Sequence, residues 1–354
     1  MKGIILHGGH GTRLRPLTHT GPKQLLPIAN KPMSQYCLES LTDAGISEIA
    51  IIIGGTGSNK VQEYYENGEK FGVKITYVNQ DYPRGIAHAI NLCKEFVGND
   101  KFVVFLGDNI IKKSIKDYVS RFEQSDVSAS ILLCEVNNPT QFCIADVKDG
   151  IIKKIMEKPK NPPTNLAVTG IYLLTPIIFN IIERLKPSWR NEYEITDALQ
   201  MLLEENHKII YDMVTDYWKD TGTPHDIIHA NEVILSSMKP YFYGKKEENV
   251  LITGNVMIGE GTIIKNGSKI TGPVIIGKEC TIGPDANIGP NISIGDNSKL
   301  SRCKIENSII MSGCNIDGNF KIQNSIIAFN SEIIKTDNSD SNVFLLGEGT
   351  KISL

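Results

Sequence analysis

A glycine-rich segment follows the first apolar run of the chain. Gly8, Gly9 and Gly11 stand where their backbone N–H groups can come close to phosphate oxygens. Arg13 ends the segment and Lys23 follows it, so two cations are available to clamp a polyphosphate. The segment is neither a Walker A loop, because no Gly-Lys-Ser/Thr follows, nor a dinucleotide fingerprint, because leucine replaces the third glycine. It predicts a phosphate-binding loop, although each cation taken alone could equally be a surface charge.

Two aspartates stand at positions that suit a metal ion. Asp108 comes just after the apolar run 102–106, and Asp220 opens the turn Asp220-Thr221-Gly222. Magnesium prefers carboxylate oxygens, takes few protein ligands and keeps water and phosphate at its other positions. We therefore expect Asp108 and Asp220 to hold Mg²⁺. The alternative is that each aspartate is only a turn or cap residue.

The elements that must position these residues alternate between strands and helices up to about residue 240. Short β-branched runs predict strands at 3–6, 48–53, 74–78 and 102–106. Amphipathic segments between them predict helices at 34–44, 58–65 and 86–96. Such alternation is typical of a doubly wound, Rossmann-like α/β domain, whose ligands lie beyond the carboxyl ends of the strands. Later strands, at 128–136, 145–147, 151–157 and 167–173, predict a mixed sheet with an additional lobe.

A six-residue repeat replaces this pattern after residue 250. One aliphatic residue recurs at an unbroken interval of six, at Ile258, Ile264, Ile270, Ile276, Ile282, Ile288, Ile294 and Leu300. The register breaks after Leu300 and resumes at Ile310. Such a repeat, with small residues and glycine at the corners, predicts a left-handed parallel β-helix. We therefore expect a catalytic domain at 1–240, a linker at 241–249 and a β-helix domain at 250–354.

Several motifs of the first domain together resemble those of the sugar-1-phosphate nucleotidyltransferase family. In chain order they are Gly8-Gly9-His10-Gly11-Thr12-Arg13-Leu14, Pro22-Lys23-Gln24-Leu25-Leu26-Pro27, Leu106-Gly107-Asp108-Asn109, Glu157-Lys158-Pro159, Val168-Thr169-Gly170, Arg190-Asn191-Glu192-Tyr193-Glu194 and Trp218-Lys219-Asp220-Thr221-Gly222. Within this family the chain is most similar to glucose-1-phosphate thymidylyltransferases of the long form, which carry a C-terminal left-handed β-helix.

The resemblance implies one set of residues for the nucleotide. Arg13 and Lys23 would hold the triphosphate, Gln24 would contact the ribose, and Gln80 with Gly85 would contact the pyrimidine. A glutamine amide can satisfy a pyrimidine edge but cannot separate thymine from uracil. The nucleotide set is Leu6, Gly8, Gly9, Gly11, Thr12, Gln24, Gln80 and Gly85. His7 replaces the small residue usual before the first glycine, and either stacks on the base or packs in the interior.

The resemblance implies a second set for the sugar phosphate. Lys158 and Arg190 would bind the phosphate, and Glu157, Gly170 and the backbone at Val168 would bind sugar hydroxyls. Phe142 and Cys143 stand where the family commonly has tyrosine and glycine in the sugar pocket, so a hydroxyl is missing and a β-carbon is added. The catalytic set implied by the resemblance is Arg13, Lys23, Asp108, Lys158 and Asp220.

These roles imply transfer of a deoxythymidylyl group from dTTP to glucose 1-phosphate, giving dTDP-glucose and pyrophosphate with Mg²⁺ as cofactor. The sugar phosphate attacks the α-phosphorus in line, and two polyanions need positive charge more than acid–base chemistry. The alternatives are UTP dependence, a bifunctional uridylyltransferase and acetyltransferase acting on N-acetylglucosamine 1-phosphate, and a catalytically silent sensor. Related acetyltransferase domains generally use a histidine base, whereas all seven histidines precede the repeat. A sensor would lose the charged site residues, which are present.

Composition limits the partners and the compartment. The 37 basic and 40 acidic residues give a formal net charge of −3, without a basic patch for nucleic acid. The seven cysteines lack Cys-x-x-Cys spacing, and no apolar run is long enough for a signal peptide or a membrane span. We therefore expect a cytoplasmic protein without nucleic-acid or membrane partners. The β-helix predicts a homo-oligomer, a trimer or a multiple of one.

Overall fold

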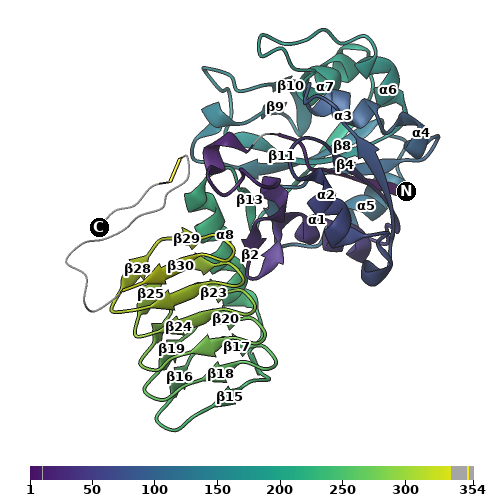
Figure 1. Ribbon diagram of the computed structural model, residues 1–354. Coiled ribbons are helices and arrows are strands. Elements are labelled where there is room, and N and C mark those ends of the chain that lie inside the picture. Colours follow the sequence, from purple (N-terminus) through teal and green to yellow (C-terminus); the bar gives the residue numbers. More distant parts are fainter. Residues whose placement is uncertain (10, 336–348, 351–354) are drawn as a thin grey trace. The chain divides into compact units, whose positions relative to one another are not determined.

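The computed structural model describes residues 1–9, 11–335 and 349–350, and the chain divides into two compact units (Figure 1). The first unit comprises residues 1–11, 18–25 and 33–220, and the second comprises residues 12–17, 26–32 and 221–354. Two short N-terminal segments therefore group with the C-terminal part, which no sequence pattern indicated. The division near residue 240 stays a prediction. Of the expected β-helix domain, residues 336–348 and 351–354 lie outside the described residues.

The first unit is built on a nine-stranded mixed sheet. Its main path runs β10-β9-β11-β6-β1-β4-β5, and β8 pairs with both β11 and β12. β1 pairs in parallel with β4 and β6, whereas β11 runs antiparallel to β6. The predicted doubly wound, mixed sheet is therefore confirmed. Its strands are β1 (Lys2–Leu6), β4 (Glu48–Ile53), β5 (Lys74–Asn79), β6 (Phe102–Leu106), β8 (Ala129–Glu135), β9 (Ile144–Lys148), β10 (Ile151–Met156), β11 (Leu166–Leu174) and β12 (Ile209–Met213).

Helices cover both faces of this sheet. One apolar core contains α1, α2 and α5, and the other contains α3, α4, α6 and α7. Ile4 and Ile5 of β1 enter opposite cores, because successive side chains of a strand point to opposite faces. The helices are α1 (Met33–Asp43), α2 (Ser58–Tyr65), α3 (Ile86–Asn91), α4 (Lys94–Val97), α5 (Lys116–Glu123), α6 (Ile177–Ile182) and α7 (Ile195–Glu204). A separate two-stranded ladder joins β7 (Asn109–Ile111) to β13 (Trp218–Asp220).

The helix predicted at 86–96 is interrupted. α3 ends at Asn91 and α4 begins at Lys94. The Cys93 N–H donates to the Ile90 carbonyl at 2.9 Å, three residues back instead of four, which tightens the chain into a 3₁₀-type turn. The prediction of one continuous helix was wrong, because apolar residues continue through the break.

The second unit contains the predicted left-handed β-helix as three parallel sheets (Figure 1). Strands of one coil pair with those of the next, as β17 does with β20 and β18 with β21. The first sheet contains β14 (Tyr241–Phe242), β17 (Val256–Ile258), β20 (Val274–Ile276), β23 (Ile292–Ile294), β26 (Ile309–Ile310) and β29 (Ile326–Ile327). The second contains β15 (Lys245–Lys246), β18 (Ile263–Ile264), β21 (Thr281–Ile282), β24 (Lys299–Ser301), β27 (Asn315–Asp317) and β30 (Glu332–Ile334). The third contains β16 (Leu251–Thr253), β19 (Lys269–Thr271), β22 (Asn287–Ile288), β25 (Lys304–Glu306) and β28 (Lys321–Gln323).

The repeated aliphatic residues fill the interior of the β-helix. All eight, from Ile258 to Leu300, are buried. Beyond Leu300 the ladder continues at Ile305 and then Ile310, each five residues on, and Ile305 stacks on Ile288. The register break in the sequence therefore arises from two corners that are each one residue shorter. The β-helix continues through them without interruption.

The segment 241–249, expected as a linker, contains β14 and β15, which pair with β17 and β18. The same unit includes the hairpin of β2 (Pro27–Ile28) and β3 (Lys31–Pro32), and helix α8 (Pro224–Ser237). α8 begins at a capping box, in which Thr223 and Asp226 satisfy each other's backbone N–H groups. In the described ranges no helix is both long and apolar enough to cross a bilayer.

Candidate active site

Asp108 lies just beyond the carboxyl end of β6, beside the carboxyl end of the parallel strand β1. The Gly107 N–H donates to the Leu6 carbonyl at 3.0 Å, which joins this turn to the end of β1. The Asp108 carboxylate pairs with the Lys23 ammonium and accepts a hydrogen bond from Asn109 Nδ2 at 2.9 Å. Burial opposes ionisation of Asp108, but the charge and hydrogen bond of Lys23, with hydrogen bonds from the backbone and Asn109, outweigh it and hold the pKa of that carboxyl below its usual value. Asp108 is therefore a carboxylate at neutral pH.

Asp220 lies on the strand beside this turn. β13 pairs antiparallel with β7, and Asp220 stands opposite Asn109, the residue after Asp108. The two aspartates thus come from distant parts of the sequence to one ladder, with Asp108 immediately before β7 and Asp220 on β13. Their hard oxygen donors fit a magnesium ion that takes its other ligands from phosphate and water. In the part of the chain that the structure describes, no three or more His, Cys, Asp or Glu side chains are grouped so that they could hold a metal ion. Phosphate and water would therefore have to complete the coordination of the ion.

Trp218 orients the amide next to Asp108. Its Nε1–H donates to Asn109 Oδ1 at 2.7 Å and to the Thr169 carbonyl at 2.8 Å. Because Oδ1 is held by the indole, Asn109 Nδ2 is directed to Asp108. Gly170 leaves room for this amide, since a β-carbon there would stand 3.2 Å from Asn109 Nδ2. The predicted site lacked Trp218 and Asn109, although both stand in its motifs.

The glycine loop follows β1. The Gly8 carbonyl accepts a hydrogen bond from Gln24 Nε2 at 2.9 Å, which ties the loop to the helical turn Lys23–Leu25. Gly9 and Gly11 have φ angles of +92° and +59°. These angles lie in the left-handed region that favours glycine. Of the predicted loop residues, Gly8 therefore lies beside Gln24.

Gln80 follows the end of β5 and approaches the glycine loop, and Gly85 stands immediately before α3. Gln80 Oε1 lies 3.8 Å from the place that a β-carbon of Gly8 would occupy, and Gln80 Nε2 lies 2.9 Å from His88 Nδ1. Gly85 has a φ of +102°, and a β-carbon there would stand 2.5 Å from the Tyr193 carbonyl oxygen. Glycine is thus required at position 85 for the close approach of Tyr193.

His7 packs in the interior next to the loop. It is 2% exposed, and its ring lies edge-to-face with Tyr65 at a centroid distance of 6.0 Å. Burial lowers the pKa of His7 to about 3, so the ring is neutral. Among the described residues neither ring nitrogen has a hydrogen-bond partner. Of the two possibilities for His7, the structure has the packed one.

Arg190 is surrounded by glutamates. Its guanidinium nitrogens lie 3.3 Å from Glu157 Oε1, 3.1 Å from Glu192 Oε1 and 3.4 Å from Glu194 Oε1. Lys158 Nζ lies 3.5 Å from Glu157 Oε1. Burial raises the pKa of Glu194, and the charge of Glu157 adds to the shift. A phosphate that engages Arg190 would therefore compete with these carboxylates for the guanidinium.

Backbone hydrogen bonds gather the remaining predicted sugar-side residues. The Val168 N–H donates to the Cys143 carbonyl at 2.9 Å, and the Lys158 N–H donates to the Phe142 carbonyl at 3.2 Å. The Phe142 ring lies edge-to-face against Trp218 at 5.6 Å. Burial and nearby carboxylates raise the pKa of the Cys143 thiol well above its usual range, so it stays protonated.

Thr12 and Arg13 belong to the second unit and are exposed. In that unit a β-carbon on Gly222 would stand 2.9 Å from Arg13 Nη2. The glycine of the Asp-Thr-Gly turn therefore leaves space for the guanidinium.

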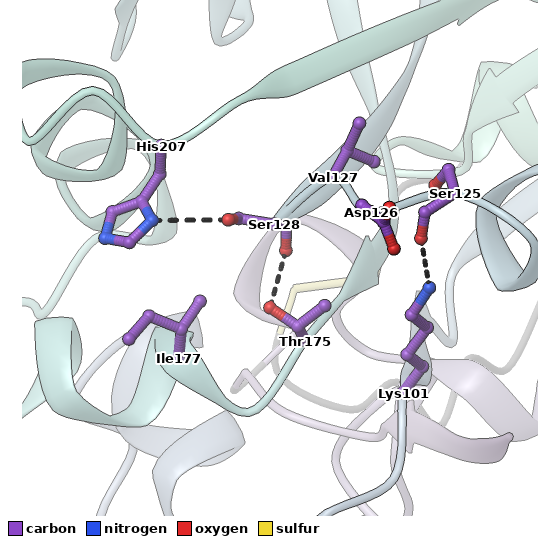
Figure 2. A pocket seen from close by; sticks show the side chains of 8 residues that line it. All are labelled: Lys101, Ser125, Asp126, Val127, Ser128, Thr175, Ile177 and His207. Atoms are coloured by element: carbon purple, nitrogen blue, oxygen red, sulfur yellow. Dashed lines mark hydrogen bonds between the residues drawn. The ribbon is translucent and has the colours of Figure 1, made fainter.

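A separate depression of about 300 Å³ lies at the opposite end of the sheet, and Figure 2 shows the side chains that line it. Its lining residues are Lys101, Ser125, Asp126, Val127, Ser128, Thr175, Ile177 and His207. Lys101 precedes β6 and Ser128 precedes β8, so the depression faces away from Asp108. Lys101 Nζ donates to the carbonyls at the end of α5, at 3.0 Å from Phe122 O and Glu123 O. Its charge therefore caps a helix C-terminus, and none of the predicted site residues lies here.

A family model described as nucleotidyl transferase matches residues 2–237. The chain belongs to this family. A second model, described as GMPPB C-terminal domain, matches residues 270–353. The predicted family membership and transferase class are therefore confirmed.

Full-length relatives of this nucleotidyl transferase are known. The low-salt glycan biosynthesis nucleotidyltransferase Agl11 of Haloferax volcanii is 43% identical over 100% of both chains. A glucose-1-phosphate thymidylyltransferase of Streptomyces antibioticus is 38% identical over 100% of this chain and 99% of its own. A crystal structure of a putative glucose-1-phosphate thymidylyltransferase from Bacillus anthracis, in complex with sucrose, is 40% identical with a TM-score of 0.64. The match covers 68% of the present chain and 98% of the Bacillus anthracis chain.

Proposed function

We propose that this nucleotidyl transferase transfers a deoxythymidylyl group from dTTP to glucose 1-phosphate, giving dTDP-glucose and pyrophosphate. The observation that carries the proposal is the ion pair of Lys23 and Asp108, with Asp220 on the adjoining strand. Full-length similarity to a glucose-1-phosphate thymidylyltransferase supports the choice of nucleotide and sugar. The residue roles taken from the resemblance are part of the proposal.

On the nucleotide side, Arg13, Lys23 and the N–H groups of the glycine loop bind the triphosphate. Lys23 exchanges the Asp108 carboxylate for a phosphate oxygen when the nucleotide arrives. Asp108 and Asp220 would then hold Mg²⁺, whose positive charge would stabilise the negative charge that develops on the leaving pyrophosphate. Gln80, oriented by His88, pairs with the pyrimidine edge.

On the sugar side, Lys158 and Arg190 hold the phosphate of the sugar. One of its oxygens attacks the α-phosphorus and forms a new P–O bond. In line with it, the bond between the α-phosphorus and the oxygen that bridges to the β-phosphate breaks, and pyrophosphate leaves. The nucleophile is already an anion, so no side chain has to remove a proton. Arg190 is released from a glutamate when it binds the phosphate, and that glutamate becomes available to sugar hydroxyls.

Pyrophosphate release tests the proposal directly. dTTP and UTP are each paired with glucose 1-phosphate, with N-acetylglucosamine 1-phosphate and with no sugar, in the presence of magnesium. We expect the fastest sugar-dependent release with dTTP and glucose 1-phosphate. Because one methyl group in an apolar pocket is worth only about 1–3 kcal/mol, UTP should be used more slowly. Fastest release with UTP and N-acetylglucosamine 1-phosphate would favour a uridylyltransferase, and no release with any pair would favour a sensor.

The metal assignment has its own test. Asp108→Asn removes one carboxylate charge from the magnesium site, and we expect turnover to fall by about a hundredfold or more. Asp149→Asn is the matched control, because Asp149 is exposed and its φ of +53° suits asparagine. Near-normal turnover in a folded Asp108→Asn variant would contradict the assignment.

A further inference from the structure

The turn of the β2–β3 hairpin has an unfavourable backbone. Ala29 and Asn30 have φ angles of +48° and +63°, in the left-handed region. Asparagine tolerates this region, but alanine adopts it only when its surroundings hold it there. The hairpin must therefore be fixed by contacts outside itself.

One buried amide supplies the main contact. Asn231 of α8 is fully buried, and its Oδ1 accepts hydrogen bonds from the Ala29 N–H at 2.8 Å and from Ser293 Oγ at 2.7 Å. The neighbouring Asn30 Nδ2 donates to the Ile294 carbonyl of β23 at 2.6 Å. The hairpin, α8 and the β-helix are thus joined at Asn231.

Apolar contacts reinforce this junction. Ala29 is buried in one cluster with Leu235 of α8, Met257 of β17 and Ile275 of β20. The side chains of Met257 and Ile275 point out of the β-helix, since their neighbours Ile258 and Ile276 fill its interior. Three successive coils therefore support the hairpin, through β17, β20 and β23.

The supported hairpin continues directly from the turn Lys23–Leu25, with Leu26 as the next residue. We propose that Asn231 is a positioning residue for the nucleotide, because it fixes the carboxyl end of the segment that carries Lys23 and Gln24. This inference rests on the proposed nucleotide role of those two residues. It gives the β-helix a part in nucleotide binding, beside the assembly role predicted from the sequence.

A second anchor holds the same segment and provides the competing explanation. Ser34 Oγ, at the start of α1, donates to the Gln24 carbonyl at 3.1 Å. If that bond alone positioned the segment, loss of Asn231 would leave nucleotide binding unchanged. The two possibilities therefore predict different binding constants for an Asn231 variant.

Asn231→Ala tests the inference, with Glu232→Ala, the exposed neighbour on α8, as the control. We expect the dissociation constant and the KM for dTTP to rise about tenfold, as for the loss of buried hydrogen bonds. The KM for glucose 1-phosphate should stay within about twofold. Hydrogen–deuterium exchange of peptides covering 23–32 should become faster. Ser293→Ala removes one of the two hydrogen bonds to Asn231 Oδ1 and should give smaller changes of the same kind. This variant replaces Asn231→Ala in the test if Asn231→Ala does not fold.

A lower melting temperature with unchanged dTTP binding, or unchanged exchange in 23–32, would overturn the positioning role and leave Asn231 a purely structural residue. Calorimetric titration of the wild type with dTTP and UTP separates this failure from that of the proposed function. If neither nucleotide binds, the proposed function falls and the inference falls with it. If the wild type and Asn231→Ala bind equally well, only the inference is overturned.

Discussion

Asp108 has both of its carboxylate oxygens engaged by donors. The Lys23 ammonium pairs with Oδ2, and the Asn109 amide donates to Oδ1. Before substrate arrives, the ammonium therefore supplies positive charge next to a partly buried carboxylate, at the site proposed for magnesium. The pair thus keeps the site ionised in the free enzyme.

Lys23→Met should reverse the pH dependence of stability that Asp108 causes. In the wild type the folded pKa of Asp108 is lowered, so its stabilising contribution is present above the unfolded pKa and is lost as the pH falls through the folded pKa. Without the ammonium, burial raises the folded pKa, and stability should instead increase as the pH falls through that raised value. Urea unfolding between about pH 3 and pH 7 measures the difference. In Lys23→Met/Asp108→Asn this contribution should vanish, and a wild-type profile in Lys23→Met would contradict the account.

Trp218→Phe should weaken the proposed magnesium site while leaving both of its proposed aspartate ligands in place. The variant loses the Nε1–H that holds Asn109 Oδ1, so the amide is no longer directed to Asp108. We expect the apparent magnesium affinity to fall about tenfold, as for other residues that orient metal ligands. A magnesium titration of turnover measures it. Trp189→Phe is the matched control, because Trp189 is 88% exposed, and equal titrations for both variants would contradict the role of Trp218.

The motifs predicted which residues form the site, but not how their side chains pair. Lys23 and Asp108 are far apart in sequence, and their ion pair depends on the sheet that brings β6 next to β1. Arg190 was expected to bind phosphate, yet in the structure three glutamates surround it. Spacing along a chain does not report such neighbours, because they come from different strands and turns.

Among the elements, those whose apolar residues recur at a regular interval were predicted with the correct first and last residues. β4, β6 and α2 begin and end where the sequence pattern placed them. The hairpin of β2 and β3 was missed, because its positive φ at Ala29 is held by Asn231, about two hundred residues away. A local pattern cannot contain that information.

The shortened corners of the β-helix give a prediction for a single element. Ile305 of β25 is fully buried, and Ile305→Ala should lower the free energy of unfolding by about 2–5 kcal/mol through the cavity it leaves. Ile263→Ala is the matched control, since Ile263 is 39% exposed on the neighbouring sheet. Chemical unfolding monitored by circular dichroism measures both. Equal losses would show that Ile305 does not belong to the interior ladder.

For the whole molecule, assembly stays a prediction. The outward faces of the β-helix carry apolar side chains, with Leu251 51% and Phe242 44% exposed. Exposed apolar groups of this kind favour association between copies. We expect a trimer or a multiple of it, and light scattering at several concentrations measures the mass. A mass of about one chain, 39.1 kDa, would contradict the prediction.

The β-helix also divides into coils with different freedom to change. Each coil bonds to its neighbours through parallel strands, as β20 does to β17 and β23, so a whole coil can be added or lost without disturbing distant ones. The coils of β17, β20 and β23 also support the hairpin and α8, and a duplication or deletion there would move the contacts of Asn231. A duplication or deletion should therefore be tolerated better at the later coils, those of β26 and β29, than at the coils of β17, β20 and β23.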